Sequence, residues 1–433
     1  MNQPSAMNAD EANIVGMVHA SRAAAAAGRM TEADQLLTRA SFFAPHHPFV
    51  NNELGVRALQ RNDAVAAAEC FSKATAADPR HPALWSNLAS ALHELGRFEE
   101  EREAIEKALA IDPRHLSSLL QKGALLEATG NTRAAVEIYQ NALATIPEGA
   151  VIPPNVEQAI KRARSVVENG QEEFFQMIQE RISTLVCNAS AADRRRADRC
   201  FEILTGRRRV YVPEPTFMHF PGLPIIEFFD REDLAWLDDV EAATDDIRAE
   251  FLSVFTTDRE GLEPYVAYPD GVPLDQWKEL NQSRRWSAYF LWNQGEALLE
   301  HIARCPITAS VLEQTPRCSV RSRAPTAFFS ILDGKTHIPP HSGVTNTRLT
   351  VHLPLVVPAG CRFRVGSDAR EWVQGKAWAF DDSINHEAWN DSDLPRAILL
   401  FDVWNPLLTP IEREMVRVAT ETYNEFHHGP STA

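Results

Sequence analysis

The sequence predicts a multidomain α + β protein, with a helical repeat solenoid followed by a β-rich domain that has flanking helices. Three observations support this fold class. The first third of the chain repeats with a period of 34 residues. Short apolar runs separated by turn residues dominate from residue 324 onward. Within this second part, His341, His386 and Arg396 stand at a spacing that core packing rarely produces.

The repeat period identifies residues 12–147 as a tetratricopeptide repeat array. Gly or Asn supplies a left-handed residue at the end of the first helix of each unit, and proline stops the second helix. Four units fit this pattern: 12–45, 46–79, 80–113 and 114–147. The residues that mark the period are Pro45, Pro79, Pro113 and Pro147, then Ala40, Ala74, Ala108 and Ala142, and Gly28, Asn62, Gly96 and Gly130.

A solenoid of this kind leaves a long concave face, which usually binds a peptide or a protein. We therefore expect the array to hold a peptide or protein partner. The alternative is a scaffold or dimerisation module without a specific ligand. Residues 148–197 are expected to form capping and linker helices, with one or two helices over 153–186.

Composition excludes some classes of function. The chain has 433 residues, enough for two or three domains, and a net charge of −16, which disfavours a nucleic-acid partner. The sequence shows neither an apolar stretch of membrane-span length nor a secretory signal. The six cysteines are scattered without a Cys-x-x-Cys motif, which fits a reducing compartment. We expect a cytoplasmic location.

The C-terminal part, residues 198–433, contains extended, helical and strand-like sequence patterns. Residues 211–224 are Pro-rich and extended, and residues 230–257 have helical periodicity, with Leu234, Leu237, Val240 and Ile247 on one side. Several strands separated by turn signals favour a sandwich or barrel, and a double-sheet jelly roll is the specific prediction. The expected strands are 326–332, 347–355, 362–365, 376–380 and 396–404.

Strand parity groups the polar residues of 347–353. Arg348, Thr350 and His352 share one face of this strand, because side chains alternate along it. We expect His341 in the loop before the strand and His386 between two later strands. Since Arg396 opens the last long strand, the fold can bring all these residues to one pocket.

The residue types indicate a chemistry. Two neutral imidazoles can hold a transition metal, and arginine can bind a carboxylate through two parallel hydrogen bonds. His341, His386 and Arg396 therefore suggest an iron oxygenase with an organic-acid co-substrate. Asp381 and Asp382 are expected to bond to backbone at the turn or to orient a histidine.

Taken together, the motifs of residues 330–406 resemble those of the aspartyl/asparaginyl β-hydroxylases. The resemblance implies Fe(II), with 2-oxoglutarate and O2 as co-substrates, on a double-stranded β-helix (jelly roll). Members of this family often carry an N-terminal repeat array, and the array at residues 12–147 is consistent with the resemblance. The matching elements are Ser330, 341–355, 380–383, 386–390, Arg396 and 402–406.

The resemblance assigns roles to individual residues. His341 and His386 match the iron ligands, and Arg396 matches the partner of the distal carboxylate of 2-oxoglutarate. The further co-substrate contacts match Ser330 and His352. Arg348 matches a basic residue near the substrate carboxylate, and Trp286 matches an aromatic residue that lines the pocket.

Two positions bear on the ligand sets. Thr350 stands where better-known members have a second arginine, a departure that bears on the identity of the substrate. Gly343 stands where most non-haem iron oxygenases have a carboxylate ligand, and the resemblance implies that water fills this coordination position.

The predicted function is hydroxylation of the β-carbon of aspartyl or asparaginyl residues in a peptide or protein. One alternative keeps this chemistry and changes the substrate to a free amino acid or an acyl group. The other is a catalytically silent, repeat-based adaptor protein.

Overall fold

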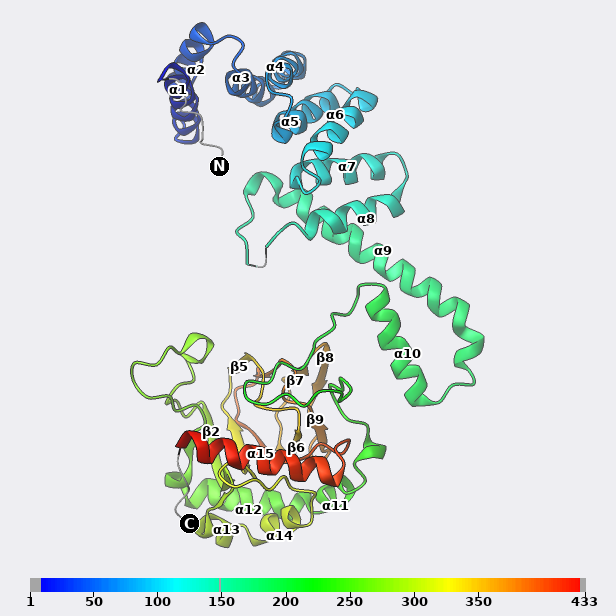
Figure 1. Cartoon of the computed structure of the whole chain (residues 1–433), viewed down its shortest axis with the longest axis vertical. Coiled ribbons are helices and arrows are strands. Elements are labelled where there is room, and N and C mark those ends of the chain that lie inside the picture. The colour runs from blue at the N-terminus through cyan, green and yellow to red at the C-terminus, as the bar shows by residue number, and fades with distance from the viewer. Residues whose placement is uncertain (1–8, 148, 429–433) are drawn as a thin grey trace. The chain divides into compact units, whose positions relative to one another are not determined.

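The computed structural model describes residues 9–147 and 149–428, and the chain separates into two compact units between Arg207 and Arg208 (Figure 1). The predicted domain boundary at residue 198 lies within a helix, α10 (Ala191–Leu204). This helix belongs with the N-terminal unit.

Over residues 9–147, the N-terminal unit consists of antiparallel helix pairs, as the 34-residue period predicts. The residue after the first helix of each pair has a positive φ: 76° at Gly28, 59° at Asn62, 68° at Gly96 and 77° at Gly130. This confirms the role of the repeated Gly and Asn. The paired helices are α1 (Ala9–Ala26) with α2 (Met30–Phe43), α3 (Pro48–Gln60) with α4 (Ala64–Ala77), α5 (Pro82–Glu94) with α6 (Phe98–Ile111), and α7 (Leu116–Ala128) with α8 (Thr132–Leu143).

Small residues allow the paired helices to approach each other closely. The four repeated alanines are fully buried, and Gly55 and Gly123 lie directly against aromatic rings. A Cβ atom at Gly123 would lie 2.3 Å from the Tyr139 ring. A long helix, α9 (Pro154–Val186), packs against α8 and covers the last pair, which confirms helical structure over 153–186.

The C-terminal unit contains two antiparallel sheets. The larger sheet has the strand order β1 (Glu263–Pro264), β2 (Trp286–Asn293), β4 (Ala327–Leu332), β11 (Arg396–Trp404), β6 (Arg348–Val356) and β9 (Trp378–Phe380), with β3 (Glu296–Ala297) beside β2. The smaller sheet has the order β5 (Thr336–His341), β10 (His386–Asn390), β7 (Cys361–Val365) and β8 (Asp368–Glu371).

Helices cover one face of the larger sheet, and the smaller sheet covers the other. Leu349, Val351 and Leu353 of β6 pack in one apolar cluster with the helices, whereas Trp286, Phe363 and Ala388 from both sheets share a second cluster. No helix among the described residues is long and apolar enough to cross a bilayer. The helical elements are α11 (Leu237–Ala242), α12 (Thr244–Thr257), α13 (Leu299–Arg304), α14 (Pro306–Glu313), α15 (Pro410–His428) and the 3-10 turns Arg231–Asp233, Arg259–Gly261 and Asp275–Trp277.

The placement of His341 in a loop was wrong, whereas His386 lies between two later strands as expected, at the start of a further strand that was not predicted. His341 is the last residue of β5, and His386 is the first residue of β10. The Pro339–Pro340 pair hides β5 in the sequence, because proline cannot donate a ladder hydrogen bond. Since β5 is an edge strand of its sheet, this missing donor is tolerated.

We expect Gly123→Ala to lower the stability of the helical unit by about 1–3 kcal/mol, because the new methyl group overpacks against the Tyr139 ring. Thermal unfolding of the full chain, followed by far-UV circular dichroism, measures this change. Gly16→Ala is the matched control, since Gly16 is exposed in α1 with no atom within 4 Å of its Cβ position. Equal melting temperatures for Gly123→Ala and wild type would contradict the close approach.

Candidate active site

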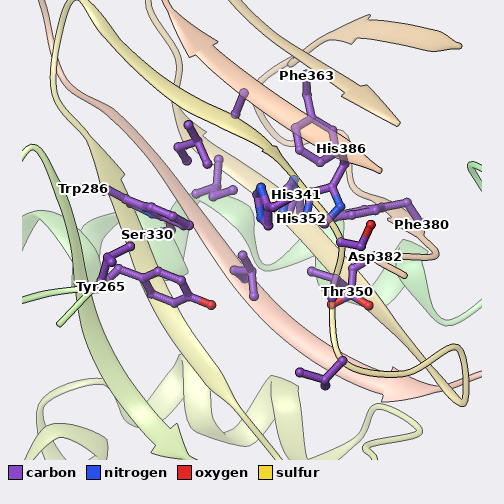
Figure 2. Close-up of a pocket in the computed structure, with 18 of the residues that line it drawn as sticks. Tyr265, Trp286, Ser330, His341, Thr350, His352, Phe363, Phe380, Asp382 and His386 are labelled. Atoms are coloured by element: carbon purple, nitrogen blue, oxygen red, sulfur yellow. The ribbon is translucent and has the colours of Figure 1, made fainter. Parts of the chain in front are cut away.

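One pocket of about 700 Å³ lies between the two sheets of the C-terminal unit (Figure 2). This volume is within the range of small-molecule sites. The pocket brings together all seven residues that the sequence singles out, and Thr350 lines it as well. The seven residues are Trp286, Ser330, His341, Arg348, His352, His386 and Arg396.

The two candidate metal ligands face each other across neighbouring strands. His386 of β10 is the direct register partner of His341 of β5. Directly opposed residues of an antiparallel pair hold their side chains close together on one face. The centroids of the two imidazole rings are 4.1 Å apart, and Figure 2 shows both rings directed toward the middle of the pocket.

Backbone carbonyls fix the tautomer of both rings. Nδ1 of His341 donates to the carbonyl oxygen of Pro339 at 2.8 Å, and Nδ1 of His386 donates to that of Ile384 at 2.9 Å. Burial lowers the pKa of His341 to about 3 and that of His386 to about 4. Each ring is therefore neutral near pH 7, and its unprotonated Nε2 carries the lone pair. This is the state in which histidine binds a metal.

The donor set consists of two neutral imidazoles, which are suitable ligands for a transition metal. In the described part of the chain, no group of three His, Cys, Asp or Glu side chains is arranged to hold a metal ion. Sterics explain why position 343 is glycine, because a Cβ atom there would lie 2.4 Å from Cγ of Asp382. The Asp382 carboxylate thus occupies the space into which a side chain at 343 would project.

The two neighbouring aspartates have different roles. Asp381 accepts hydrogen bonds from the backbone N–H and the hydroxyl of Ser383, as expected for a turn residue. Asp382 instead lines the pocket and accepts a hydrogen bond from Thr350 Oγ1 at 3.2 Å. Asp382 was expected to bond to backbone or to orient a histidine, and no sequence pattern marked it as a pocket residue.

Arg396 is a buried cation without a protein counter-ion in the described residues. Its side chain is fully buried, and Nε and Nη1 have no hydrogen-bond partner there. The guanidinium lies 4.9 Å from the centroid of the Trp372 ring. Burial lowers the pKa of Arg396 to about 10, so the group stays charged at neutral pH. A buried cation of this kind calls for an anionic ligand.

Other polar groups line the same part of the pocket. Trp286 Nε1 donates to Ser330 Oγ at 3.1 Å, which orients the hydroxyl. His352 is buried, and its Nδ1 has no partner among the described residues. Burial, followed by the charge of Arg396, lowers the pKa of His352 well below its usual value. A neutral imidazole and a hydroxyl therefore lie near the buried cation.

An aromatic wall completes the pocket. Tyr265 stacks on Trp286 with ring centroids 4.1 Å apart, and Trp277 contacts His341 with centroids 5.0 Å apart. Of these three aromatic residues, only Trp286 was expected in the pocket from the sequence. Tyr265 and Trp277 come from the irregular segment before β2, and no short-range pattern marks them as pocket residues.

Comparisons with known proteins agree with the resemblance seen in the sequence. Residues 241–406 match the family model described as aspartyl/asparaginyl beta-hydroxylase, and residues 52–115 match a tetratricopeptide repeat model. Human aspartyl/asparaginyl beta-hydroxylase is 38% identical over 144 residues, which are 33% of this chain and 19% of that protein.

Two further relatives align over longer stretches. Human aspartate beta-hydroxylase domain-containing protein 2 is 31% identical over 215 residues, or 49% of this chain and 55% of the relative. The ornithine lipid ester-linked acyl 2-hydroxylase of Rhizobium tropici is 32% identical over 185 residues, or 42% of this chain and 62% of the relative. The alignments span about a fifth of the human and mouse aspartyl/asparaginyl beta-hydroxylases, at 19% of each.

The lowered pKa of His386 predicts a pH-dependent stability. The unfolded state binds a proton below the usual pKa of 6.5, whereas the folded state stays neutral down to about 4. Stability that is present near pH 7 is therefore lost as the pH falls through this window. Between pH 7 and pH 5, we expect the free energy of unfolding of wild type to fall by about 2 kcal/mol more than that of His386→Asn. The asparagine N–H can still donate to Ile384.

Urea unfolding of the metal-free chain measures this effect. Tryptophan fluorescence reports mainly on the C-terminal unit, because every tryptophan except Trp85 lies there. The control is His337→Asn, since His337 lies on β5 outside the pocket with 44% of its side chain exposed. The prediction is wrong if both variants keep the wild-type pH dependence.

Proposed function

We propose that this chain is an Fe(II)- and 2-oxoglutarate-dependent dioxygenase that hydroxylates the β-carbon of aspartyl or asparaginyl residues in a peptide or protein. Its residues 241–406 match the aspartyl/asparaginyl beta-hydroxylase family model. One observation carries the proposal. Two neutral imidazoles line the same pocket as one buried cation that has no counter-ion among the residues the structure describes. The geometry matches the needs of a metal and a small diacid.

Each residue has a task in this proposal. His341 and His386 would hold the iron through Nε2, in ring orientations that the carbonyls of Pro339 and Ile384 fix. Arg396 would bind the distal carboxylate of 2-oxoglutarate, and Ser330 Oγ and His352 Nδ1 would supply further contacts. When bound, iron and 2-oxoglutarate supply an O2-dependent oxidation that inserts one oxygen atom into a C–H bond and yields succinate and carbon dioxide.

We also propose that the two sheets form a double-stranded β-helix. The antiparallel order of both sheets and the pocket between them support this fold.

The repeat array is proposed to hold the peptide or protein that carries the target residue. We further propose a reducing, cytoplasmic setting, and the six cysteines, all free thiols, are consistent with it.

A second candidate keeps the chemistry and changes the substrate to an acyl group or a free amino acid. The match to the Rhizobium tropici acyl 2-hydroxylase favours this alternative. Succinate release in the presence of acidic peptides, amino acids or acyl substrates separates the two candidates. A silent adaptor would release no succinate with any of them.

We expect His341→Ala and His386→Ala each to abolish Fe(II)-dependent turnover of 2-oxoglutarate to succinate, because each removes one of two protein ligands. His337→Ala is the matched control, since His337 bonds to Glu387 on β10 and does not line the pocket. Circular dichroism establishes that the variants are folded. Retained turnover in both histidine variants would refute the iron assignment.

We expect Arg396→Gln to weaken 2-oxoglutarate binding by about 2–5 kcal/mol, which is at least about thirty-fold in the dissociation constant. The physical reason is the loss of a buried charge-assisted pair. The binding isotherm for 2-oxoglutarate, measured without O2, gives the change. Arg362→Ala, an exposed position on β7, should leave the affinity as in wild type. An unchanged affinity in Arg396→Gln would contradict the role of Arg396 as the partner of the distal carboxylate.

A further inference from the structure

The pocket holds a second arginine whose charge the protein already balances. Nη1 of Arg348 donates to Oδ2 of Asp402 at 2.6 Å and to the carbonyl oxygen of Arg323 at 3.4 Å. The two charged side chains are 18% and 6% exposed. A substrate carboxylate would therefore have to share this guanidinium with a buried carboxylate.

The next inward residue of β6 carries no charge. Thr350 donates through Oγ1 to Oδ2 of Asp382, which leaves Oδ1 of this buried carboxylate without a hydrogen-bond partner in the described chain. Figure 2 shows Thr350 and Asp382 together on one side of the pocket, with Tyr265 and Trp286 on the other. On this side the pocket presents an acceptor where a carboxylate ligand would need a donor.

An unused donor complements this acceptor. Nε of Arg348 is buried and also lacks a partner in the described residues. Both Arg348 and Asp382 line the pocket. A primary amide has one carbonyl acceptor and one N–H2 donor, so it can satisfy both groups. A carboxylate can satisfy only Arg348, because it has no hydrogen atom to donate to Oδ1 of Asp382.

The cost of desolvation also favours a primary amide over a carboxylate in this pocket. The rings of Tyr265, Trp277 and Trp286 supply an apolar wall, against which a charged group loses hydration. Removing a carboxylate from water costs far more than removing an amide. The remaining guanidinium of the pocket, Arg396, is assigned to the co-substrate.

We infer that this pocket selects a substrate with an uncharged primary-amide side chain, as in asparagine, over the corresponding carboxylate. The inference rests on the proposed function, since it assigns the substrate class of the same site. Arg348 and Asp382 bind the two ends of the amide, and Thr350 keeps the surrounding charge low by being neutral.

Two matched probes test this selection. They are N-acetyl-L-asparagine methylamide and N-acetyl-L-aspartate methylamide, titrated calorimetrically into the full chain with Fe(II) and 2-oxoglutarate in the absence of O2. The asparagine probe should bind at least about tenfold more tightly at pH 7.5, a difference of about 1.4 kcal/mol. Equal binding, tighter binding of the acid, or binding of neither probe at tens of millimolar would overturn the inference.

Substitutions at position 350 add a test of mechanism. Thr350→Arg places a second cation beside Asp382 and should shift the preference toward the aspartate probe by at least about tenfold. Thr350→Val removes the hydroxyl without adding charge, so it should keep the asparagine preference. If Thr350→Arg folds and leaves the preference of wild type unchanged, charge at this position does not set selectivity.

The inference and the proposed function fail in different ways. Fe(II)-dependent conversion of 2-oxoglutarate to succinate, measured on the same preparations, tests the proposed function alone. Turnover combined with a preference for the acid probe would overturn only the inference. Absence of turnover with every substrate would overturn the proposed function itself.

Discussion

The candidate active site depends on a buried positive charge that no described residue neutralises. Arg396 lies between two sheets, fully buried, and its guanidinium leaves two nitrogens without partners in the described residues. Isolated buried charges are costly, and folds normally pair them. Arg348, in the same pocket, shows this normal solution through its ion pair with Asp402. The charge of Arg348 is thus balanced within the protein, whereas the charge of Arg396 is left for an anionic ligand.

Strand register explains how two distant histidines meet. His341 and His386 are far apart in the sequence, yet the antiparallel pairing of β5 with β10 makes them direct partners. The same geometry sets each Nδ1 against a carbonyl two residues earlier in the chain. In the proposed iron site, metal binding would therefore depend on backbone geometry as much as on the two side chains, because the backbone determines which nitrogen stays unprotonated.

Much of this arrangement could be predicted from the sequence, because it follows from local periodicity. The 34-residue repeat fixed the helix pairs, and alternation along β6 placed Arg348, Thr350 and His352 on the pocket side. The short strands β5 and β10 were missed, because one carries two prolines at a sheet edge and the other is polar at both ends. The Asp402 pair and the aromatic wall depend on tertiary contacts that no short-range pattern records.

The most direct test of the central claim is a calorimetric titration of 2-oxoglutarate into the wild-type chain without O2, with and without Fe(II). We predict one site per chain and tighter binding when Fe(II) is present, because the buried guanidinium would hold one end of the diacid and the metal would hold the other. Absence of binding, or an affinity that does not depend on Fe(II), would contradict it.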